Sequence, residues 1–285
     1  MVLKPKYLSC DKIYEMEASQ GRFHKDFYEK TRKTRFSVLS DFGYLLSCEL
    51  LEPQESTPEA YKKLAILCHG FSHSKYGSLI YAEIFLKLGY TVIIYDHRNH
   101  GSSGKACTSM GFYEKYDLNK IVDWCYNRFG QNLYLVTHGE SMGAATVILH
   151  LGIDDRVRCV IADCAYSDLR QLLRHQLKTY YHLPLFLVPV ESLITFLRAG
   201  FWYRQVSPIR IVSRTEKPIL FIHGKRDGYV PTYMSKQMYA CKKDKKAIYL
   251  VAGAVHARSC MQNRSGYAER IEAFLHRYNS KHSFS

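Results

Sequence analysis

Short apolar runs of four or five residues recur along the chain and alternate with longer helical patterns. The short runs, which indicate strands, are Leu64 to Cys68, Thr91 to Tyr95, Leu133 to Val136, Cys159 to Ala162, Ile219 to Ile222 and Ala247 to Val251. The helical patterns are Leu79 to Leu88, Lys115 to Phe129, Met142 to Leu151, Thr232 to Cys241 and Tyr267 to Tyr278. Strands that are apolar throughout and alternate with helices predict an α/β fold, in which helices flank a mostly parallel central sheet.

Two segments add to this alternation. Phe36 to Leu39 and Tyr44 to Leu51 flank the turn-like Ser40-Asp41-Phe42-Gly43 and predict an N-terminal β-hairpin at the start of the sheet. Residues 165–214 hold two helix-like runs where a simple doubly wound fold needs one connection. We interpret this stretch as a helical cap inserted over the sheet. Residues 34–285 then form the main domain, and residues 1–33 form an N-terminal extension whose aromatic residues suggest that it packs against that domain.

The pentapeptide from Gly139 to Gly143 lies between a predicted strand and a predicted helix. A serine held at such a sharp turn has a strained backbone, and side chains two residues to either side would collide across the turn. Glycine at both flanking positions therefore makes Ser141 a candidate nucleophile.

A serine hydroxyl needs a general base, and the base needs a carboxylate partner. In a parallel sheet these groups come from loops at the carboxyl ends of the strands. His256 follows the last predicted strand and is the candidate base, while Asp227 follows the preceding strand and is the candidate acid. Asp163, at the end of a neighbouring strand, is the alternative acid. We expect Asp96 to hold the loop around residues 98–101 by hydrogen bonds instead.

The oxyanion of a tetrahedral intermediate needs two backbone N–H donors. The residue after the nucleophile, Met142, and a residue in the loop after the first parallel strand, Phe71, are the candidates for this oxyanion hole. Gly70 lets the backbone turn its amide inward.

These segments resemble those of α/β-hydrolases, and the resemblance extends from about Phe36 to the C-terminal helix. The matching segments are His69 to Ser72, Asp96 to Gly104, Gly139 to Gly143, and the loops that bear Asp227 and His256. They are similar to the bacterial branch with serine-aminopeptidase-like and monoacylglycerol-lipase-like members, which are often esterases on small acyl esters. The early loop lacks the Gly-Gly-Gly run of some lipases. Residues before about position 34 match no motif of the family.

The predicted cap is rich in aromatic residues, and four of them are candidates for a substrate pocket: Tyr180, Tyr181, Trp202 and Tyr203. Such residues suit an apolar acyl or aryl group. The alternative is that about half of the cap aromatics pack the cap onto the sheet. The cap also carries seven Arg or Lys residues and two acids, Asp168 and Glu191, so an anionic end of the substrate is conceivable.

Composition limits the other function classes. The chain of 285 residues has a formal net charge of +14, but its basic residues are spread over the whole length without a nucleic-acid-binding motif. The nine cysteines are scattered and no metal-ligand spacing occurs, so we expect reduced thiols, no metal and no organic cofactor. The first twenty residues lack a signal-peptide pattern and Leu183 to Leu197 is too short to span a bilayer, which favours a cytoplasmic protein without stable membrane insertion.

The sequence therefore predicts a serine hydrolase that cleaves small to medium carboxylic esters through an acyl-enzyme. A peptidase or a thioesterase with the same triad remains the alternative. A non-catalytic protein that uses the same fold to bind a ligand or a partner is the alternative of a different class. Composition and motifs leave the oligomeric state open.

Overall fold

The computed structural model describes residues 8–54 and 62–279. Eight strands form one sheet in the order β1-β2-β4-β3-β5-β6-β7-β8. The strands are β1 (Lys33–Leu39), β2 (Leu45–Leu51), β3 (Lys63–Cys68), β4 (Thr91–Tyr95), β5 (Tyr134–Glu140), β6 (Cys159–Asp163), β7 (Ile219–Gly224) and β8 (Lys246–Val251). The hairpin of β1 and β2 is antiparallel, β2 joins β4 antiparallel, and the six strands from β4 to β8 along the sheet run parallel.

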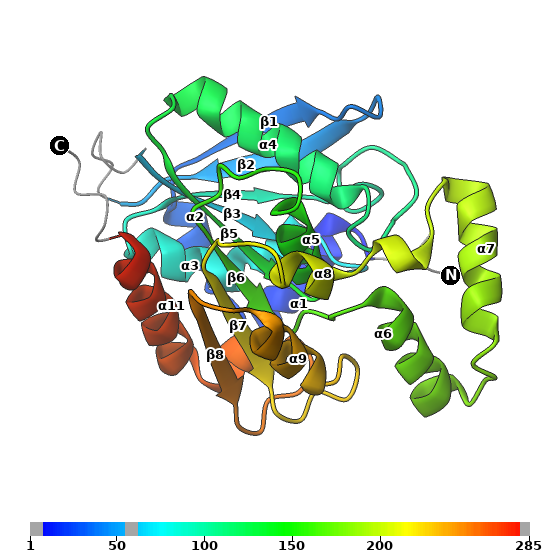
Figure 1. Cartoon of the computed structure of the whole chain (residues 1–285). Coiled ribbons are helices and arrows are strands. Elements are labelled where there is room, and N and C mark those ends of the chain that lie inside the picture. Colours follow the sequence, from blue (N-terminus) through cyan, green and yellow to red (C-terminus); the bar gives the residue numbers. More distant parts are fainter. Residues whose placement is uncertain (1–7, 55–61, 280–285) are drawn as a thin grey trace.

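Alternate residues of each parallel strand face opposite helical layers. In β3, Ala65 and Leu67 pack toward helices α3 (Leu79–Lys87) and α11 (Arg264–Asn279). Leu64 and Ile66 pack toward the opposite layer, which consists of α4 (Glu114–Phe129), α5 (Met142–His150), α8 (Pro208–Val212) and α9 (Tyr233–Cys241). Because both faces of the sheet are buried, its central parallel strands consist largely of apolar residues. This is the predicted α/β architecture (Figure 1).

Two strands extend further than the apolar runs predict. β5 continues through Thr137-His138-Gly139-Glu140, and β7 continues through His223-Gly224. These polar residues are buried, and the ladder pairs His138 with Ile161 and His223 with Leu250. His138 is accommodated because its Nε2 lies 2.8 Å from the hydroxyl of Tyr267. Hydropathy alone ends a strand at the first polar residue, so it misses buried polar residues that have a partner.

The N-terminal segment packs on the sheet as a small helical layer. Phe23, in the connection between helices α1 (Cys10–Ser19) and α2 (Lys25–Lys30), and Tyr28 of α2 belong to the core cluster that also holds residues of α3 and α11. The aromatic residues Tyr14, Phe23 and Tyr28 contact one another with ring centroids 5.1 to 6.4 Å apart. The predicted packing of this segment against the main domain is therefore observed for the described residues from position 8 onward, and residues 1–7 lie outside them.

The segment between β6 and β7 is helical, as predicted for residues 165–214. It contains α6 (Leu169–Gln176), a π-helical turn (Leu177–Tyr181), α7 (Leu187–Ala199), a short 3₁₀ turn (Tyr203–Gln205) and α8. In Figure 1, α6 and α7 lie beside the sheet rather than on either of its helical layers. A further helix that the hydropathy pattern did not predict, α10 (Ser259–Gln262), precedes α11.

Candidate active site

Ser141 lies at the turn between β5 and α5 in a strained conformation. Its φ is 56°, in the left-handed region that a non-glycine residue rarely adopts. A Cβ on Gly143 would lie 2.1 Å from the carbonyl oxygen of Cys68, and one on Gly139 would lie 2.3 Å from the backbone of Gly143. The N–H of Ser141 donates to the carbonyl of Asp163 at 2.8 Å, which holds the turn against β6. The two glycines are therefore sterically required, as the sequence predicts.

The three predicted triad residues meet at the carboxyl ends of the strands. His256 Nε2 lies 3.0 Å from Ser141 Oγ, and His256 Nδ1 lies 2.7 Å from Asp227 Oδ2. Asp227 is buried, Ser141 is 9% exposed, and His256 is partly exposed. An ionised carboxylate can only accept, so Nδ1 carries the proton and Nε2 is free to accept from the serine hydroxyl.

The carboxylate of Asp227 is held by four polar groups. Its Oδ1 accepts from the N–H groups of Tyr229 at 3.0 Å and Val230 at 2.9 Å, and its Oδ2 lies near both His256 and His223 Nε2, the latter at 3.2 Å. Burial opposes ionisation, but the hydrogen bonds from His223 and His256 outweigh it and lower the pKa of Asp227 to about 2. Sequence reasoning assigned no role to His223, although it stands four residues before Asp227, near the end of β7.

Asp163, the alternative acid, faces a different environment. Its Oδ2 accepts hydrogen bonds from the hydroxyls of Tyr267 at 3.1 Å and Tyr81 at 3.5 Å. Burial, together with the nearby carboxylate of Glu140, raises the pKa of Asp163 to about 7. The carboxylate beside His256 is that of Asp227, so the geometry favours Asp227 over Asp163.

Arg22, from the N-terminal segment, connects the two halves of this site, and sequence reasoning missed it. Its Nη2 donates to Glu140 Oε2 at 2.9 Å, directly before Ser141, and its Nη1 donates to the carbonyl of Ala257 at 2.8 Å, directly after His256. Its Nε lies 2.5 Å from Glu17 Oε2, and the side chain is buried. One guanidinium thus connects the turn that carries Ser141, through the side chain of Glu140, with the turn that carries His256, through the carbonyl of Ala257.

The predicted oxyanion loop is braced by histidines. His69 Nε2 accepts from the N–H of His97 at 3.0 Å, and His100 Nε2 accepts from the N–H of Ser72 at 3.1 Å, next to Phe71. Both imidazoles are buried, which lowers their pKa and keeps them neutral. Met142 is the first residue of α5, where N–H groups have no helical acceptor. The amides of Phe71 and Met142 therefore belong to the two segments that flank Ser141, and their role as oxyanion donors stays a prediction.

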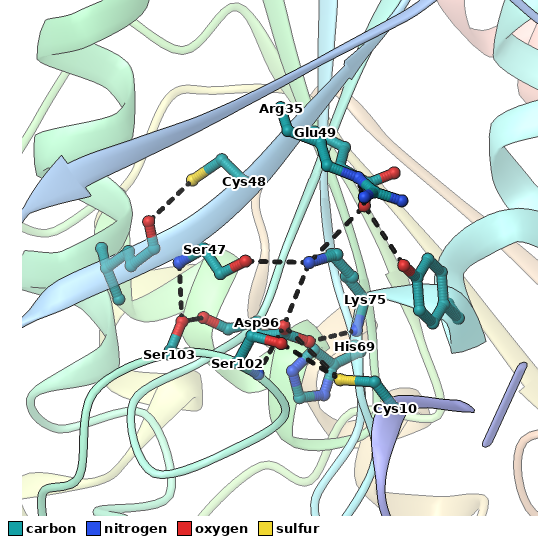
Figure 2. Close-up of polar contacts among 12 residues, drawn as sticks. Cys10, Arg35, Ser47, Cys48, Glu49, His69, Lys75, Asp96, Ser102 and Ser103 are labelled. Carbon is teal, nitrogen blue, oxygen red and sulfur yellow. Dashed lines mark hydrogen bonds and ion pairs between the residues drawn. The ribbon is translucent and has the colours of Figure 1, made fainter. Parts of the chain in front are cut away.

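Asp96 fixes the neighbouring loop, as the sequence predicts. Its carboxylate accepts from the N–H of Lys75 at 2.7 Å and from the N–H of Ser102 at 3.0 Å. Figure 2 shows Lys75 between Asp96 and Glu49, with Nζ 3.3 Å from Asp96 Oδ2 and 3.6 Å from Glu49 Oε1. This buried ion-pair cluster connects the loop after β4 to Glu49 of β2.

The four predicted pocket residues have different surroundings. Tyr180 and Tyr181 are exposed, and the ring of Tyr180 lies 6.0 Å from that of Tyr229, which lies 5.1 Å from the His256 ring. His175 of α6 donates to the carbonyl of Gly228 at 2.7 Å, so the cap touches the Asp227 loop.

Trp202 and Tyr203 lie deeper in the cap. The ring of Trp202 stacks on Phe196 at 4.5 Å, and Tyr203 is fully buried with its hydroxyl accepting from Thr195 at 3.0 Å. Tyr203 therefore belongs to the packing of the cap: its ring lies 6.4 Å from that of Phe201, and its N–H donates to Ser192 Oγ at 3.1 Å. Among the four, ring contacts through Tyr229 connect Tyr180 to His256, and Tyr181 is the next residue along the chain.

One group of possible metal ligands comes together in the part of the chain that the structure describes. Ligand atoms of Cys164, Asp227 and His256 lie within 4.8 Å of one another. The Asp227 and His256 atoms already share a hydrogen bond, and burial raises the pKa of the Cys164 thiol well above its ordinary value. A metal would have to displace that hydrogen bond.

Among the described helices, none is both long and apolar enough to span a membrane.

Comparison with known proteins agrees with this architecture. A family model described as the alpha/beta hydrolase fold matches residues 64–188. The chain is 37% identical over 282 residues to the uncharacterized protein YqkD of Bacillus subtilis (strain 168), a match that covers 98% of this chain and 91% of that protein.

Two solved esterases have a similar structure. The Pyrococcus furiosus esterase Pf2001 matches with a TM-score of 0.73 and 21% identity, over 98% of each chain. The esterase domain of a Rhodothermus marinus protein matches with a TM-score of 0.64 and 18% identity, over 87% of this chain and 99% of that one. The sequence matches, the fold and the strand order of the sheet all indicate the same family, so the chain belongs to the α/β-hydrolase fold family.

Proposed function

We propose that the protein is a serine hydrolase that cleaves carboxylic esters with small to medium acyl or aryl groups. The observation that carries this proposal is the unbroken chain of hydrogen bonds from Asp227 through His256 to Ser141, with distances of 2.7 and 3.0 Å. Its order and geometry are those of a nucleophile, its general base and the carboxylate that orients the base.

In the proposed reaction, Ser141 Oγ attacks the ester carbonyl while His256 Nε2 takes its proton. Asp227 stabilises the imidazolium that forms, and the N–H groups of Phe71 and Met142 stabilise the oxyanion. His256 then returns the proton to the leaving alcohol, which leaves an acyl-enzyme on Ser141. Water, deprotonated by His256, hydrolyses the acyl-enzyme and restores the free serine. These steps use the chain's own residues, and no cofactor is proposed.

The choice of esters rests on the neighbours and on the cap. The similar Pyrococcus furiosus and Rhodothermus marinus structures are named as esterases. Tyr180 and Tyr181, exposed beside the Asp227 loop, are proposed to contact the acyl or aryl group, and Trp202 to support them from within the cap. Peptidase and thioesterase activities need the same triad, so a substrate panel must separate the three.

The test is covalent labelling of the purified full chain with a fluorophosphonate probe, followed by turnover on matched esters, thioesters and aminoacyl amides. We expect labelling of Ser141 and highest turnover on esters. Ser141→Ala should abolish labelling and lower turnover by about a million-fold if the triad acts as a unit. A folded wild-type protein that neither labels nor turns over any panel substrate would favour a non-catalytic binding protein.

A further inference from the structure

Helix α7 of the cap packs with its apolar face turned away from the protein. Its buried residues, Val188, Ser192 and Thr195, form a narrow and partly polar stripe. The opposite side carries Val190, Leu193, Ile194 and Leu197, and Leu197 is 74% exposed. In a globular protein the apolar stripe of a surface helix normally faces the core. In α7 the apolar stripe faces the solvent instead.

The exposed apolar surface continues into the segment before α7. Leu183, Leu185 and Phe186 are exposed there, next to Tyr180 and Tyr181. Ten of the twenty large apolar residues that are exposed in the described chain lie between positions 180 and 197. Single exposed apolar residues are normal on a protein surface, but a gathering of this kind marks an interaction site. We call this surface the cap apolar face.

Cations flank α7 on both sides of the cap apolar face. A pocket of about 250 Å³ between α6 and α7 is lined by Arg170, Arg174 and Arg204, together with Pro189 and other cap residues. With 3.6 residues per turn, Pro189 lies about a quarter of a turn from the centre of the exposed stripe, and Arg198 lies about a quarter of a turn on the other side.

The cap has few negative charges to balance these cations. Asp168 pairs with Arg170 at 3.2 Å, and Glu191 is the second acid of residues 165–214. Arg174 and Arg204 form no ion pair with a described residue, and both are exposed. The whole chain has a formal charge of +14. The occupant of this surface must therefore be apolar at its centre and anionic around its rim.

We propose that the cap docks on the surface of an anionic phospholipid bilayer. Helix α7 lies in the plane of the interface, with Leu193 and Leu197 at the boundary between head groups and acyl chains. The lipid phosphates then lie beside Arg198 on one flank and Arg174 and Arg204 on the other. At 13 residues, α7 is too short to cross a bilayer, so the contact is peripheral.

Charge separates this occupant from a second copy of the chain. Two caps placed face to face through α7 would bring together two sets of exposed cations, Arg174, Arg198 and Arg204 from each copy. Like charges that face each other across an interface oppose association, whereas anionic lipid neutralises them.

Binding is measured by flotation of the full-length chain with vesicles, at low and at physiological salt. The vesicles contain phosphatidylcholine alone, or phosphatidylcholine with about 30 mol % phosphatidylglycerol. We expect the protein to float with the anionic vesicles and to bind less well as salt rises. The Ser141→Ala variant should bind like the wild type, because docking is independent of hydrolysis, so failure of the proposed esterase function would leave this result unchanged.

Matched variants test the apolar face. Leu193→Ser with Leu197→Ser should lower partitioning by about tenfold or more, because two leucines no longer enter the interface. The control is Leu39→Ser with Leu45→Ser, since these leucines of the β1–β2 hairpin are 62% and 54% exposed and lie outside the cap. The control should bind like the wild type. Circular dichroism and thermal melting check that each variant is folded.

A second pair of variants tests the charge. Arg174→Gln with Arg204→Gln should weaken binding to anionic vesicles by about fivefold for each arginine at low salt. Arg128→Gln with Arg277→Gln removes the same charge from α4 and α11 and should have little effect. Three results would overturn the proposal: absence of flotation by the wild type, equal losses in cap and control variants, or a dimer in solution that Leu193→Ser with Leu197→Ser dissociates.

Discussion

At the scale of single residues, the environment of Asp227 prepares the candidate triad before any substrate arrives. Two backbone amides and two imidazoles converge on its carboxylate, so the carboxylate has one orientation and a low pKa. An ionised, immobile acceptor selects the His256 tautomer with its proton on Nδ1. Asp227 therefore fixes the tautomer of His256, and this tautomer leaves Nε2 free to accept the proton of Ser141.

Replacing Asp227 by Asn should lower the kcat of ester hydrolysis by about a thousandfold or more, because an amide can donate to Nδ1 and favour the wrong tautomer. Asp163→Asn, which alters the neighbouring carboxylate, should lower kcat far less. Steady-state kinetics on one chromogenic ester compare the two variants. A larger loss for Asp163→Asn would assign the acid to β6 instead of β7.

Arg22 is a positioning residue in this picture, because it touches residues adjacent to Ser141 and His256 but neither reacting group. Lysine carries its donors on a single nitrogen, so it cannot reproduce the separate contacts that three guanidinium nitrogens make with Glu140, Glu17 and the carbonyl of Ala257. We expect Arg22→Lys to lower kcat by about ten- to a hundredfold with a smaller change in KM, since misplacing the serine and histidine affects the transition state most.

The matched control for Arg22→Lys is Arg98→Lys. Arg98 is also buried and also paired, with its Nε 2.7 Å from Asp117 Oδ2 of α4. Both variants should destabilise the fold in urea titrations, because each disturbs a buried ion pair. Only Arg22→Lys should lose kcat after correction for the folded fraction. Equal kcat losses in the two variants would reduce Arg22 to a structural residue.

At the scale of elements, the cap meets the main domain at the loop after β7. His175 and Tyr180, from α6 and the π-helical turn that follows it, contact Gly228 and Tyr229, one and two residues after Asp227. Met142, directly after Ser141, belongs to the same buried cluster as Leu169 and Leu172 of α6. A change in the position of α6 is therefore transmitted to both sides of the candidate triad.

This connection predicts which cap aromatic residue controls acyl-chain length. Tyr180→Ala removes a ring beside Tyr229, so longer p-nitrophenyl esters should gain kcat/KM relative to the acetate, by at most about 0.8 kcal/mol for each newly buried methylene. Trp202→Ala should shift the profile less, because the half-buried Trp202 ring stacks on Phe196 of α7 and has no ring contact with Tyr229 or His256 among the described residues. Tyr116→Ala, an exposed tyrosine of α4, is the control. A profile that responds to Trp202 and not to Tyr180 would contradict this ranking.

At the scale of the whole molecule, the sequence predicts what local patterns encode. Continuous apolar runs indicate the buried parallel strands, and the glycines around Ser141 indicate a turn in which a Cβ would collide with backbone. The order of Ser141, Asp227 and His256 follows from the order of the strands. Each of these inferences depends on residues close together in the chain or on the common edge at which parallel strands end.

Long-range pairings were not predictable in the same way. Arg22 and Ala257 are 235 positions apart, and a lone arginine in a polar segment gives no signal of its partners. The reversed face of α7 was missed for a related reason, because a hydropathy pattern shows that a helix has an apolar side and not which way that side faces. Buried polar strand ends, such as Thr137 and His138, also required the structure.

The stability of the whole fold should depend on pH through the carboxyl group of Asp163. Asp163 ends β6 and lies between Tyr267 of α11 and Tyr81 of α3, and burial with the adjacent Glu140 raises its pKa from 3.8 to about 7. At pH values between 3.8 and about 7, Asp163 is protonated in the folded protein and ionised in the unfolded chain. The free energy of unfolding should therefore fall as the pH rises from about 4 to 7, by on the order of 1 kcal/mol per pH unit.

Asp163→Asn replaces the neutral carboxyl by an amide that does not titrate, so it should remove this slope. The free energy of unfolding of the variant, compared with that of the wild type, should therefore be larger at about pH 7 than at about pH 4.5. The contribution of Asp227 has the opposite sign, because its pKa is lowered to about 2, and it is lost only as the pH falls below about 4. Urea unfolding of wild type and variant across this range separates the two effects. Asp26→Asn, an exposed aspartate in the first turn of α2, is the control and should keep the wild-type slope. Parallel curves for wild type and Asp163→Asn would show that Asp163 does not take up a proton on folding.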